Sequence, residues 1–279
     1  MRTAEECYGC LEKLILKTVS LARTDKERRE KARLAGLAVL ERDYPKGRIP
    51  TQIAGEAQRV IREIAGDTDP FRQVKAQEME LAARMIPLVR RRFSGDLPGL
   101  LKVAVLGNAV DFFKDSDTVA AEMMAPVEFY LDQTAEFIKR LADCRRILYL
   151  ADNASECYFD LGLVQELEKY AETYYTIKGS AVQNDLTMFE LDQAGLTGKM
   201  KNIVTTETDT PGLDMELVPA GFSELFYGVD LILAKGMGYY ETLPEIEGRP
   251  PVFHVLMAKC APVARSLGVP QNSYVATFC

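Results

Sequence analysis

The sequence predicts an α/β protein: a Rossmann-like three-layer α/β/α domain with a mainly parallel sheet, joined to a helical N-terminal region. Two observations predict it. From about residue 129 onward, short apolar runs alternate with helix-length segments, which indicates right-handed βαβ crossovers. Before about Arg92, apolar residues recur at helical spacing and strand-like runs are few. We therefore expect residues 1–115 to be the helical region and residues 116–279 to be the Rossmann-like domain that carries the site.

The helical region shows its periodicity most clearly at its beginning. Leu11, Leu14, Ile15 and Val19 share one face of a helix, so this face should pack against other helices. Turn-forming residues interrupt the helical pattern in three places, at residues 43–47, 66–70 and 94–98.

The remainder of the chain predicts a sheet that is covered on both faces. Its strand candidates are short, apolar and bounded by polar residues, as buried parallel strands are. We expect strands at 146–151, 173–177, 202–206, 229–234, 252–257 and 274–278. We expect helices at 129–142, 159–170, 185–193, 222–226 and 261–267.

Composition excludes some classes of function. The chain has 34 basic and 41 acidic residues and a formal net charge of -7, which argues against an extended nucleic-acid surface. A small anionic substrate remains compatible with this charge. The N-terminus has no apolar signal segment and no later segment is long enough to span a bilayer, so we expect a cytoplasmic protein without a membrane partner. Six cysteines are too few for a disulfide framework, and we expect most to be core thiols. The oligomeric state is left open.

Polar residues stand at the carboxyl ends of three predicted strands, which is where open parallel sheets bind ligands. Carboxylate and amide oxygens match a hard divalent cation such as Mg²⁺ or Mn²⁺, and lysines match phosphate charge. Helix caps and turns are the alternative for each position taken alone. Independent caps would not require all three strand ends to be polar. The residues are Asp152 and Asn153 after 146–151, Lys178, Asn184 and Asp185 after 173–177, and Lys235 after 229–234.

Several short strings occur in a fixed order along the chain. They are Asp69-Pro70-Phe71 with Lys75, Gly107-Asn108 with Asp111, Asp152-Asn153-Ala154-Ser155-Glu156, the run from Lys178 to Thr187, the run from Leu233 to Gly238, and Ala258-Lys259-Cys260. Together they resemble the signature of the DUF89 family, the metal-dependent damage-control phosphatases. The pair Cys7 and Cys10 resembles the archaeal and bacterial subgroup of that family.

The resemblance implies a role for each matching position. Asp152, Asn153 and Asp185 would bind one divalent metal ion, Mg²⁺, Mn²⁺, Co²⁺ or Ni²⁺, and together with Lys235 would be the catalytic residues. The substrate would contact Asn108, Asp111, Glu156, Lys178 and Asn184. Three residues depart from the family pattern: Ser155 replaces a glycine, and Met237 and Tyr239 stand where the family often has Gln and Asn.

The implied reaction is hydrolysis of a small phosphorylated metabolite, either a sugar phosphate or the phosphate of a damaged metabolite. The metal would polarise a phosphoryl oxygen and lower the pKa of a bound water. Lys178 and Lys235 would neutralise phosphate charge, and a helix beginning near Asn184 would direct free N–H groups at the phosphate. Asp111 or a metal-bound hydroxide would be the base, and the sequence leaves both open.

Two other enzyme classes could use such a fold. A nucleotide- or adenosyl-cofactor enzyme, such as a methyltransferase, is the main alternative, although Gly236-Met237-Gly238 lacks the third glycine of a dinucleotide fingerprint. A haloacid-type phosphatase needs Asp-x-Asp directly after the first strand. Asp67-Thr68-Asp69 has these residue types, but it follows a helical pattern and precedes a proline that indicates a turn.

The sequence also contains two features that are weaker candidates for chemistry. Cys7 and Cys10 supply only half of a tetrahedral zinc site, and no second closely spaced cysteine pair or histidine pair accompanies them. They are either two thiols on the first turn of a helix or a metal-binding or redox pair. His254, the one histidine, lies in the apolar run 252–257, and we expect it in the core.

Overall fold

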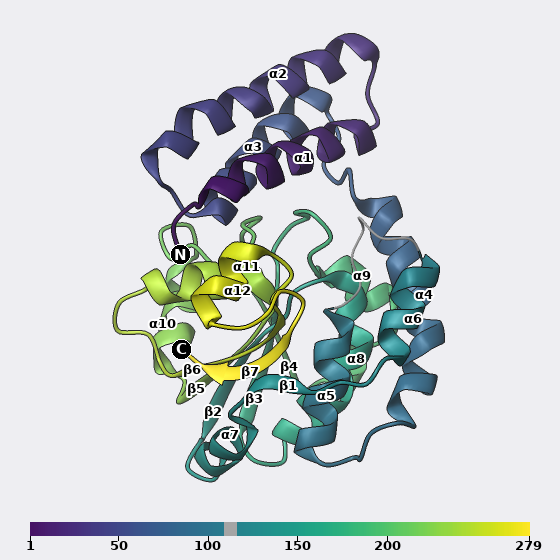
Figure 1. Ribbon diagram of the computed structural model, residues 1–279, viewed down its shortest axis with the longest axis vertical. Coiled ribbons are helices and arrows are strands. Elements are labelled where there is room, and N and C mark those ends of the chain that lie inside the picture. Colours follow the sequence, from purple (N-terminus) through teal and green to yellow (C-terminus); the bar gives the residue numbers. More distant parts are fainter. Residues whose placement is uncertain (109–115) are drawn as a thin grey trace.

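Three N-terminal helices form a layer above the rest of the molecule (Figure 1). The computed structural model describes residues 1–108 and 116–279, so the predicted substrate residue Asp111 lies outside the described residues. The helices are α1 (Glu5–Leu21), α2 (Lys26–Asp43) and α3 (Pro50–Ala65). Leu11, Ile15 and Val19 are buried in the core that the three helices share, as their spacing predicts.

The ends of these helices follow from local sequence chemistry. The Asp25 side chain accepts a hydrogen bond from the backbone N–H of Arg28 and so caps the start of α2. Pro50 occupies the first turn of α3, where its missing N–H is no loss. Gly66 ends α3 with a φ of 69°, a left-handed conformation that glycine adopts without a steric penalty.

A seven-stranded sheet lies below the helical layer within the described residues, with the strand order β1-β7-β6-β5-β2-β3-β4. Its neighbouring strands are parallel except for β6 and β7, which are antiparallel. The predicted Rossmann-like, mainly parallel sheet is therefore confirmed. The strands are β1 (Phe129–Asp132), β2 (Arg146–Leu150), β3 (Glu172–Ile177), β4 (Asn202–Thr205), β5 (Leu231–Lys235), β6 (Val252–Met257) and β7 (Tyr274–Phe278).

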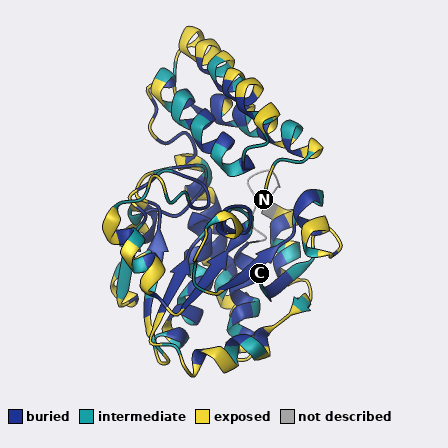
Figure 2. Cartoon of the chain, turned by 90° about the vertical axis from the view of Figure 1, so that its left-hand side faces the viewer, coloured by how far each residue is buried: buried dark blue, intermediate teal, exposed yellow. Residues whose placement is uncertain are grey.

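Helices cover both faces of this sheet, so the predicted three layers are present. Along β2, Ile147 and Tyr149 face one hydrophobic core, and Leu148 and Leu150 face the other. Figure 2 shows the sheet as a buried layer between helices whose outer sides are exposed. The first core contains residues of α4 (Arg72–Arg90), α5 (Leu97–Gly107), α6 (Ser116–Met124), α7 (Thr134–Leu141), α8 (Cys157–Leu167) and α9 (Met188–Gln193). The opposite face is covered by α10 (Ala220–Gly228), α11 (Gly236–Thr242) and α12 (Ala261–Leu267).

The prediction of one helix over residues 129–142 is wrong. Residues Phe129–Asp132 form the edge strand β1, and the helix begins only at Thr134, whose backbone N–H donates to the Asp132 carboxylate. β1 pairs with β7, which lies more than 140 residues further along the chain, near the C-terminus. A four-residue strand carries too short a pattern to be distinguished from a helical turn, and its distant partner is not visible in the local sequence. The predicted boundary at residue 115 adjoins residues outside the described part and stays a prediction.

Three smaller expectations have different outcomes. His254 is fully buried in β6, as predicted. None of the six cysteines forms a disulfide, but only Cys7 and Cys157 are buried, so the expectation that most are core residues was wrong. Cys144 and Cys260 are half-buried: Cys144 lies between α7 and β2, and Cys260 is the residue directly before α12. Across the described residues, no helix has both the length and the apolar character that a membrane crossing needs.

Candidate active site

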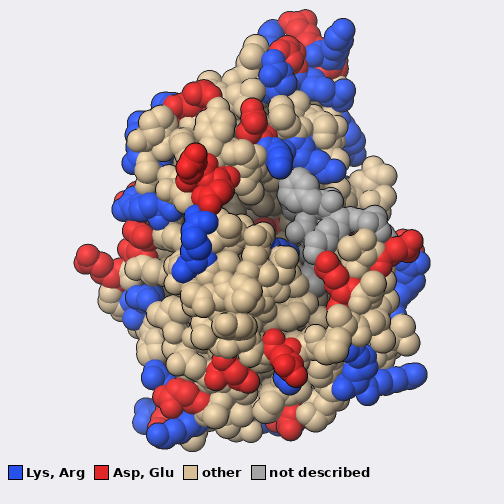
Figure 3. Space-filling model, viewed as in Figure 1, with Lys and Arg blue, Asp and Glu red and all other residues tan. Residues whose placement is uncertain are grey.

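A cavity of about 220 Å³ lies between the N-terminal helices and the carboxyl ends of the central strands. Figure 3 shows this face of the molecule hollowed below α1–α3, with acidic and basic side chains mixed over the surrounding surface. The chain runs from β2 to β3 and β4 on one side, whereas β5 and β6 lie on the other side of β2. The site thus lies at the switch point of the sheet, where open α/β sheets bind ligands.

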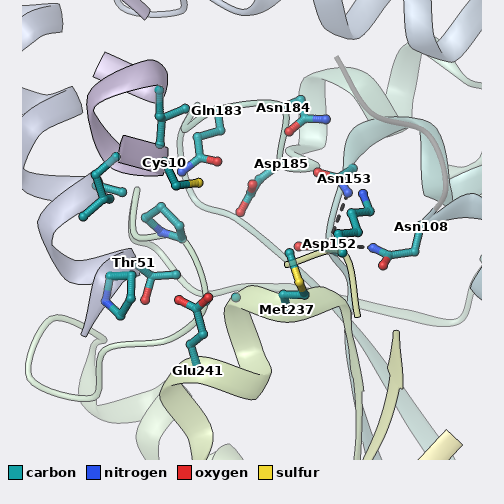
Figure 4. Close-up of a pocket in the computed structure, with 18 residues that line it drawn as sticks. Cys10, Thr51, Asn108, Asp152, Asn153, Gln183, Asn184, Asp185, Met237 and Glu241 are labelled. Atoms are coloured by element: carbon teal, nitrogen blue, oxygen red, sulfur yellow. Dashed lines mark hydrogen bonds between the residues drawn. The ribbon is translucent and has the colours of Figure 1, made fainter. Parts of the chain in front are cut away.

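The cavity brings together most of the predicted oxygen donors. Figure 4 shows Asp152, Asn153 and Asn108 grouped on one side and Asp185 and Asn184 close by. The side chains of all five residues line the cavity. They come from three places in the sequence, so their meeting is a property of the fold.

Backbone pairing holds the two acidic segments against each other. The N–H of Ala154 donates to the carbonyl of Asn184 at 2.8 Å, and the N–H of Leu186 donates to the carbonyl of Asp152 at 2.9 Å. Asn153 and Asp185 form an antiparallel bridge between these bonds. The two carboxylates are therefore fixed at one end of the cavity by main-chain hydrogen bonds.

The prediction of a helix beginning near Asn184 is wrong. The helix α9 begins at Met188, because residues 185–187 are drawn into extended pairing with Asn153 and Lys178. Thr187 caps α9 together with Glu190. Asp185 is not the helix cap, and the Asn153 side chain makes no capping hydrogen bond to the short helix at Ala154–Glu156. Neither Asn153 nor Asp185 therefore serves as a helix cap through its side chain.

Glu156 orients the amide groups beside the acidic residues. The Asn153 Nδ2 atom donates to Glu156 Oε1 at 2.7 Å and to Asp152 Oδ2 at 3.2 Å. The Asn108 Nδ2 atom donates to the same two oxygens, at 3.0 and 3.1 Å respectively, while the N–H of Met257 donates to Asn108 Oδ1 at 3.1 Å. These bonds turn the Asn153 nitrogen toward the carboxylates and leave its oxygen for another ligand.

Lys235 is paired below the cavity. Its Nζ atom donates to Glu156 Oε2 at 2.6 Å and to Asp160 Oδ1 at 2.8 Å, and all three side chains are fully buried. The hydroxyls of Tyr149 and Tyr175 also donate to Asp160, at 2.7 and 3.0 Å. Neither Lys235 nor Glu156 is among the described residues that line the cavity. Their contacts indicate that they position Asn108 and Asn153.

Lys178 is also held by neighbouring protein groups. Its Nζ atom donates to the carbonyl of Gly212 at 2.5 Å and to the hydroxyl of Tyr239 at 3.0 Å, and lies 3.6 Å from Asp185 Oδ2. Tyr239 therefore has a lysine partner at the position where the family often has Asn. Direct contact between either lysine and a phosphate stays a prediction.

Asp152 and Asp185 lack sufficient positive charge around their carboxylates. Burial, followed by the nearby charges of Glu156 and Asp185, holds the pKa of Asp152 well above its usual range. Burial also raises the pKa of Asp185 to about 6, although Lys178 opposes this shift. Glu156 differs: burial raises its pKa, but the Lys235 ammonium and the two amide donors outweigh this effect and lower it. Negative charge is thus balanced below the cavity and unbalanced inside it.

Replacing Lys235 with methionine is expected to destabilise the fold by about 3–5 kcal/mol, because two buried carboxylates lose their common cation. Urea unfolding at pH 7 measures this effect. Lys46→Met is the matched control, since Lys46 pairs with Asp43 at 2.8 Å but its side chain is 58% exposed. Asp43 is buried but keeps Arg42 and Arg48 as partners, so the loss of the exposed Lys46 should cost only about 0–1 kcal/mol. Equal losses in the two variants would contradict the assigned role of Lys235.

Gly236 allows close approach at the end of β5. It has a φ of 78°, and a Cβ atom at this position would lie 1.8 Å from Asp152 Oδ2. Only glycine therefore fits between the end of β5 and the Asp152 carboxylate. The sequence contained this signal as a lysine–glycine pair directly after an apolar run, but the neighbour that excludes a side chain is visible only in the fold.

Several residues that line the cavity were not predicted from the sequence. Lys259 lines the cavity, and its charge lowers the pKa of Asp152 against the larger effects of burial and neighbouring acids. The Ala258-Lys259-Cys260 string could have indicated it. Cys10 on α1, Thr51 on α3 and Glu241 on α11 also line the cavity. The first two come from helices whose placement over the sheet no local pattern predicts.

Comparison with known proteins identifies relatives over the whole length of the chain. A family model described as the damage-control phosphatase ARMT1-like domain matches residues 3–275. Damage-control phosphatase PH1575 of Pyrococcus horikoshii is 31% identical over 281 residues, covering 99% of this chain and 97% of the relative. A damage-control phosphatase of Archaeoglobus fulgidus is 28% identical over 286 residues, covering 99% of both chains.

A solved structure is similar over the same extent. The crystal structure of a DUF89 family protein from Pyrococcus horikoshii matches with a TM-score of 0.87 and 30% sequence identity, covering 99% of each chain. The match therefore includes the N-terminal helices as well as the sheet, so the likeness extends to both walls of the cavity.

Proposed function

Because this chain belongs to the damage-control phosphatase family with an ARMT1-like domain, we propose that Asp152, Asn153 and Asp185 hold one divalent metal ion for phosphate-ester hydrolysis. The chain is a phosphatase, as the sequence predicts, and its family is metal-dependent in general. The residues that hold the metal and the nature of the substrate are the proposal. The observation that carries it is the meeting of the half-buried Asp152 carboxylate, the buried Asp185 carboxylate and the Asn153 amide at one end of a cavity.

The donor set fits a hard divalent cation. Two carboxylates and one amide are oxygen ligands of the kind that Mg²⁺ and Mn²⁺ prefer, with the remaining positions left to water or substrate. Within residues 1–108 and 116–279, no group of three or more His, Cys, Asp or Glu side chains is arranged to hold a metal. We assign the oxygen of Asn153 as the third ligand, because the hydrogen bonds of this amide use its nitrogen. A cation between Asp152 and Asp185 would also offset the charge that raises the pKa of both carboxyls.

The surrounding residues prepare the site for a phosphate group. When bound, the metal would polarise a phosphoryl oxygen and lower the pKa of a bound water. Asn108 and Glu156 fix the orientation of Asp152 and Asn153, so little rearrangement is needed during the reaction. Lys259 is the one cationic side chain among the described cavity residues, and we assign it to the non-bridging oxygens of the phosphate. Lys178 and Lys235 support this arrangement from below.

The size of the cavity favours a compact substrate. Pockets for drug-sized ligands and cofactors span roughly 300–1,000 Å³, whereas this cavity measures about 220 Å³. A small phosphorylated metabolite fits this volume better than a dinucleotide or an adenosyl cofactor. The close approach of Gly236 to the Asp152 carboxylate also argues against a pyrophosphate at the Gly236–Gly238 segment, because like charges repel.

Removing the metal tests the proposal. Treatment with a chelator, followed by its removal, is expected to abolish phosphate release, and Mg²⁺, Mn²⁺, Co²⁺ or Ni²⁺ should restore it and raise the melting temperature by binding the native state. Nicotinamide or adenosyl cofactors should leave the melting temperature unchanged. Full turnover by protein with less than one metal ion per ten chains, measured by elemental analysis, would refute the metal site.

A further inference from the structure

We propose that Thr51 and Glu241 form a subsite that binds hydroxyl groups on the non-phosphate part of the substrate. This inference rests on the proposed function, since the metal at Asp152 and Asp185 fixes the phosphate end. Figure 4 shows Thr51 and Glu241 beside each other, on the side of the cavity away from Asn108 and Asn153. A substrate with its phosphate at the metal would extend toward them.

Both side chains carry a buried polar atom that the protein does not satisfy. The Oγ1 atom of Thr51 and the Oε2 atom of Glu241 have no hydrogen-bond partner in the described structure, and Glu241 is 9% exposed. This carboxylate accepts a hydrogen bond from the backbone N–H of Thr51. Buried polar groups are almost always hydrogen-bonded, so two adjacent exceptions that line one cavity indicate a ligand.

The fold, rather than local sequence, creates this pair. Thr51 lies in the first turn of α3, and Glu241 lies near the end of α11. The two helices approach closely at Gly238, where an added Cβ would lie 3.7 Å from the Cγ2 atom of Thr51. The subsite thus joins the N-terminal helical layer to the sheet, and each layer contributes one of the two groups.

A hydroxyl group matches the chemistry of this pair. Burial raises the pKa of Glu241 to about 7, despite the opposing effects of the Met1 amino group and the Thr51 N–H. Near neutral pH the carboxyl is present in both forms, one accepting and one donating a hydrogen bond. A hydroxyl can complement either form, and it can also pair with the Thr51 hydroxyl. An ammonium group would require the ionised form and would be repelled by the Met1 amino group.

The experiment compares three phosphate esters on the metal-loaded, full-length protein: ribose 5-phosphate, phenyl phosphate and phosphoethanolamine. They present hydroxyl groups, an apolar ring and an ammonium group. Thr51→Val and Glu241→Leu are each expected to lower the preference in kcat/KM for ribose 5-phosphate over phenyl phosphate by about tenfold, the effect of one lost hydrogen bond. Glu241→Gln should retain most of the preference, because an amide still bonds to a hydroxyl.

Matched controls separate the subsite from general effects on the fold. Thr134→Val changes another buried threonine whose hydroxyl has no partner, but Thr134 lies outside this cavity. Glu56→Gln makes the conservative change on α3, at a glutamate that pairs with Arg42 and Arg48. Both controls should keep the wild-type preference.

The possible outcomes decide the inference separately from the phosphatase proposal. An unchanged preference in both Thr51→Val and Glu241→Leu would overturn the subsite. If the wild type prefers phosphoethanolamine and Glu241→Gln abolishes this preference, the pair binds a cation rather than a hydroxyl group. Calorimetric titration of the esters into the metal-loaded protein measures the subsite without turnover. If the wild-type protein binds the three esters equally well in this titration, the subsite is contradicted. If it discriminates among them but hydrolyses none, only the proposed reaction is contradicted.

Discussion

Asp152→Asn and Asp185→Asn are each expected to lower kcat/KM for phosphate-ester hydrolysis by about 1,000-fold or more, which is the order of loss when a principal electrostatic group is removed from an active site. Each substitution keeps the shape of the side chain and removes one of the two charges that would hold the metal. Steady-state kinetics with saturating Mn²⁺ measures the loss. The same variants should lose the metal-dependent rise in melting temperature.

The stability of the metal-free protein gives a second, independent readout for Asp152. A carboxyl whose pKa is raised by folding destabilises the native state once the pH exceeds its unfolded pKa, and Asp152 is such a group. Asp152→Asn should therefore leave the melting temperature of the metal-free protein at pH 7 unchanged or higher. The Asn108 and Asn153 amides can still donate to the remaining oxygen.

Asp132→Asn is the control for both readouts. Asp132 also ends a strand, but it is exposed, accepts a hydrogen bond from the Thr134 N–H at the start of α7 and lies outside the cavity. The asparagine side-chain oxygen can accept the same hydrogen bond, so activity and stability should match the wild type. Metal-dependent turnover that survives in both Asp152→Asn and Asp185→Asn would exclude these residues as the metal ligands.

The metal-binding residues could be proposed from the sequence because their signal is local. Asp152 and Asn153 directly follow an apolar strand, and Asp185 closely follows the next one, so parallel pairing of β2 and β3 is enough to bring them to one edge of the sheet. The order of the short strings along the chain then indicated the protein family. Neither step required knowledge of how distant segments pack.

The roles of the lysines could not be predicted in the same way. Lys235 follows β5 as a phosphate-binding lysine would, but its charge is taken up by Glu156 and Asp160 on the neighbouring segment. A lysine after a strand has the same local pattern whether it meets a ligand or a buried acid. Thr51 and Cys10 were missed for a related reason, since their helices reach the cavity only through packing over the sheet. Long-range packing therefore decides which polar residues face the substrate.

The close approach of Gly236 to Asp152 leads to the second large expected effect. Gly236→Ala should lower kcat/KM by about 100-fold or more, because its Cβ would occupy the position of Asp152 Oδ2 and must displace this carboxylate. A displacement of about 1 Å is enough for a loss of this size. The φ of 78° adds backbone strain of about 1–2 kcal/mol for a residue with a side chain.

Gly248→Ala separates the strain from the clash. Gly248 has a φ of 68°, close to that of Gly236, but a Cβ atom there would meet no atom within 4 Å. Backbone strain should lower the free energy of unfolding in both variants, which urea unfolding measures. Only Gly236→Ala should also lose activity and metal affinity. If the two variants were equally active, Asp152 would tolerate displacement, and its proposed role as a fixed metal ligand would have to be abandoned. A loss of activity in Gly236→Ala alone would instead show that the position of the Asp152 carboxylate, between the ends of β2 and β5, depends on the absence of a side chain at residue 236.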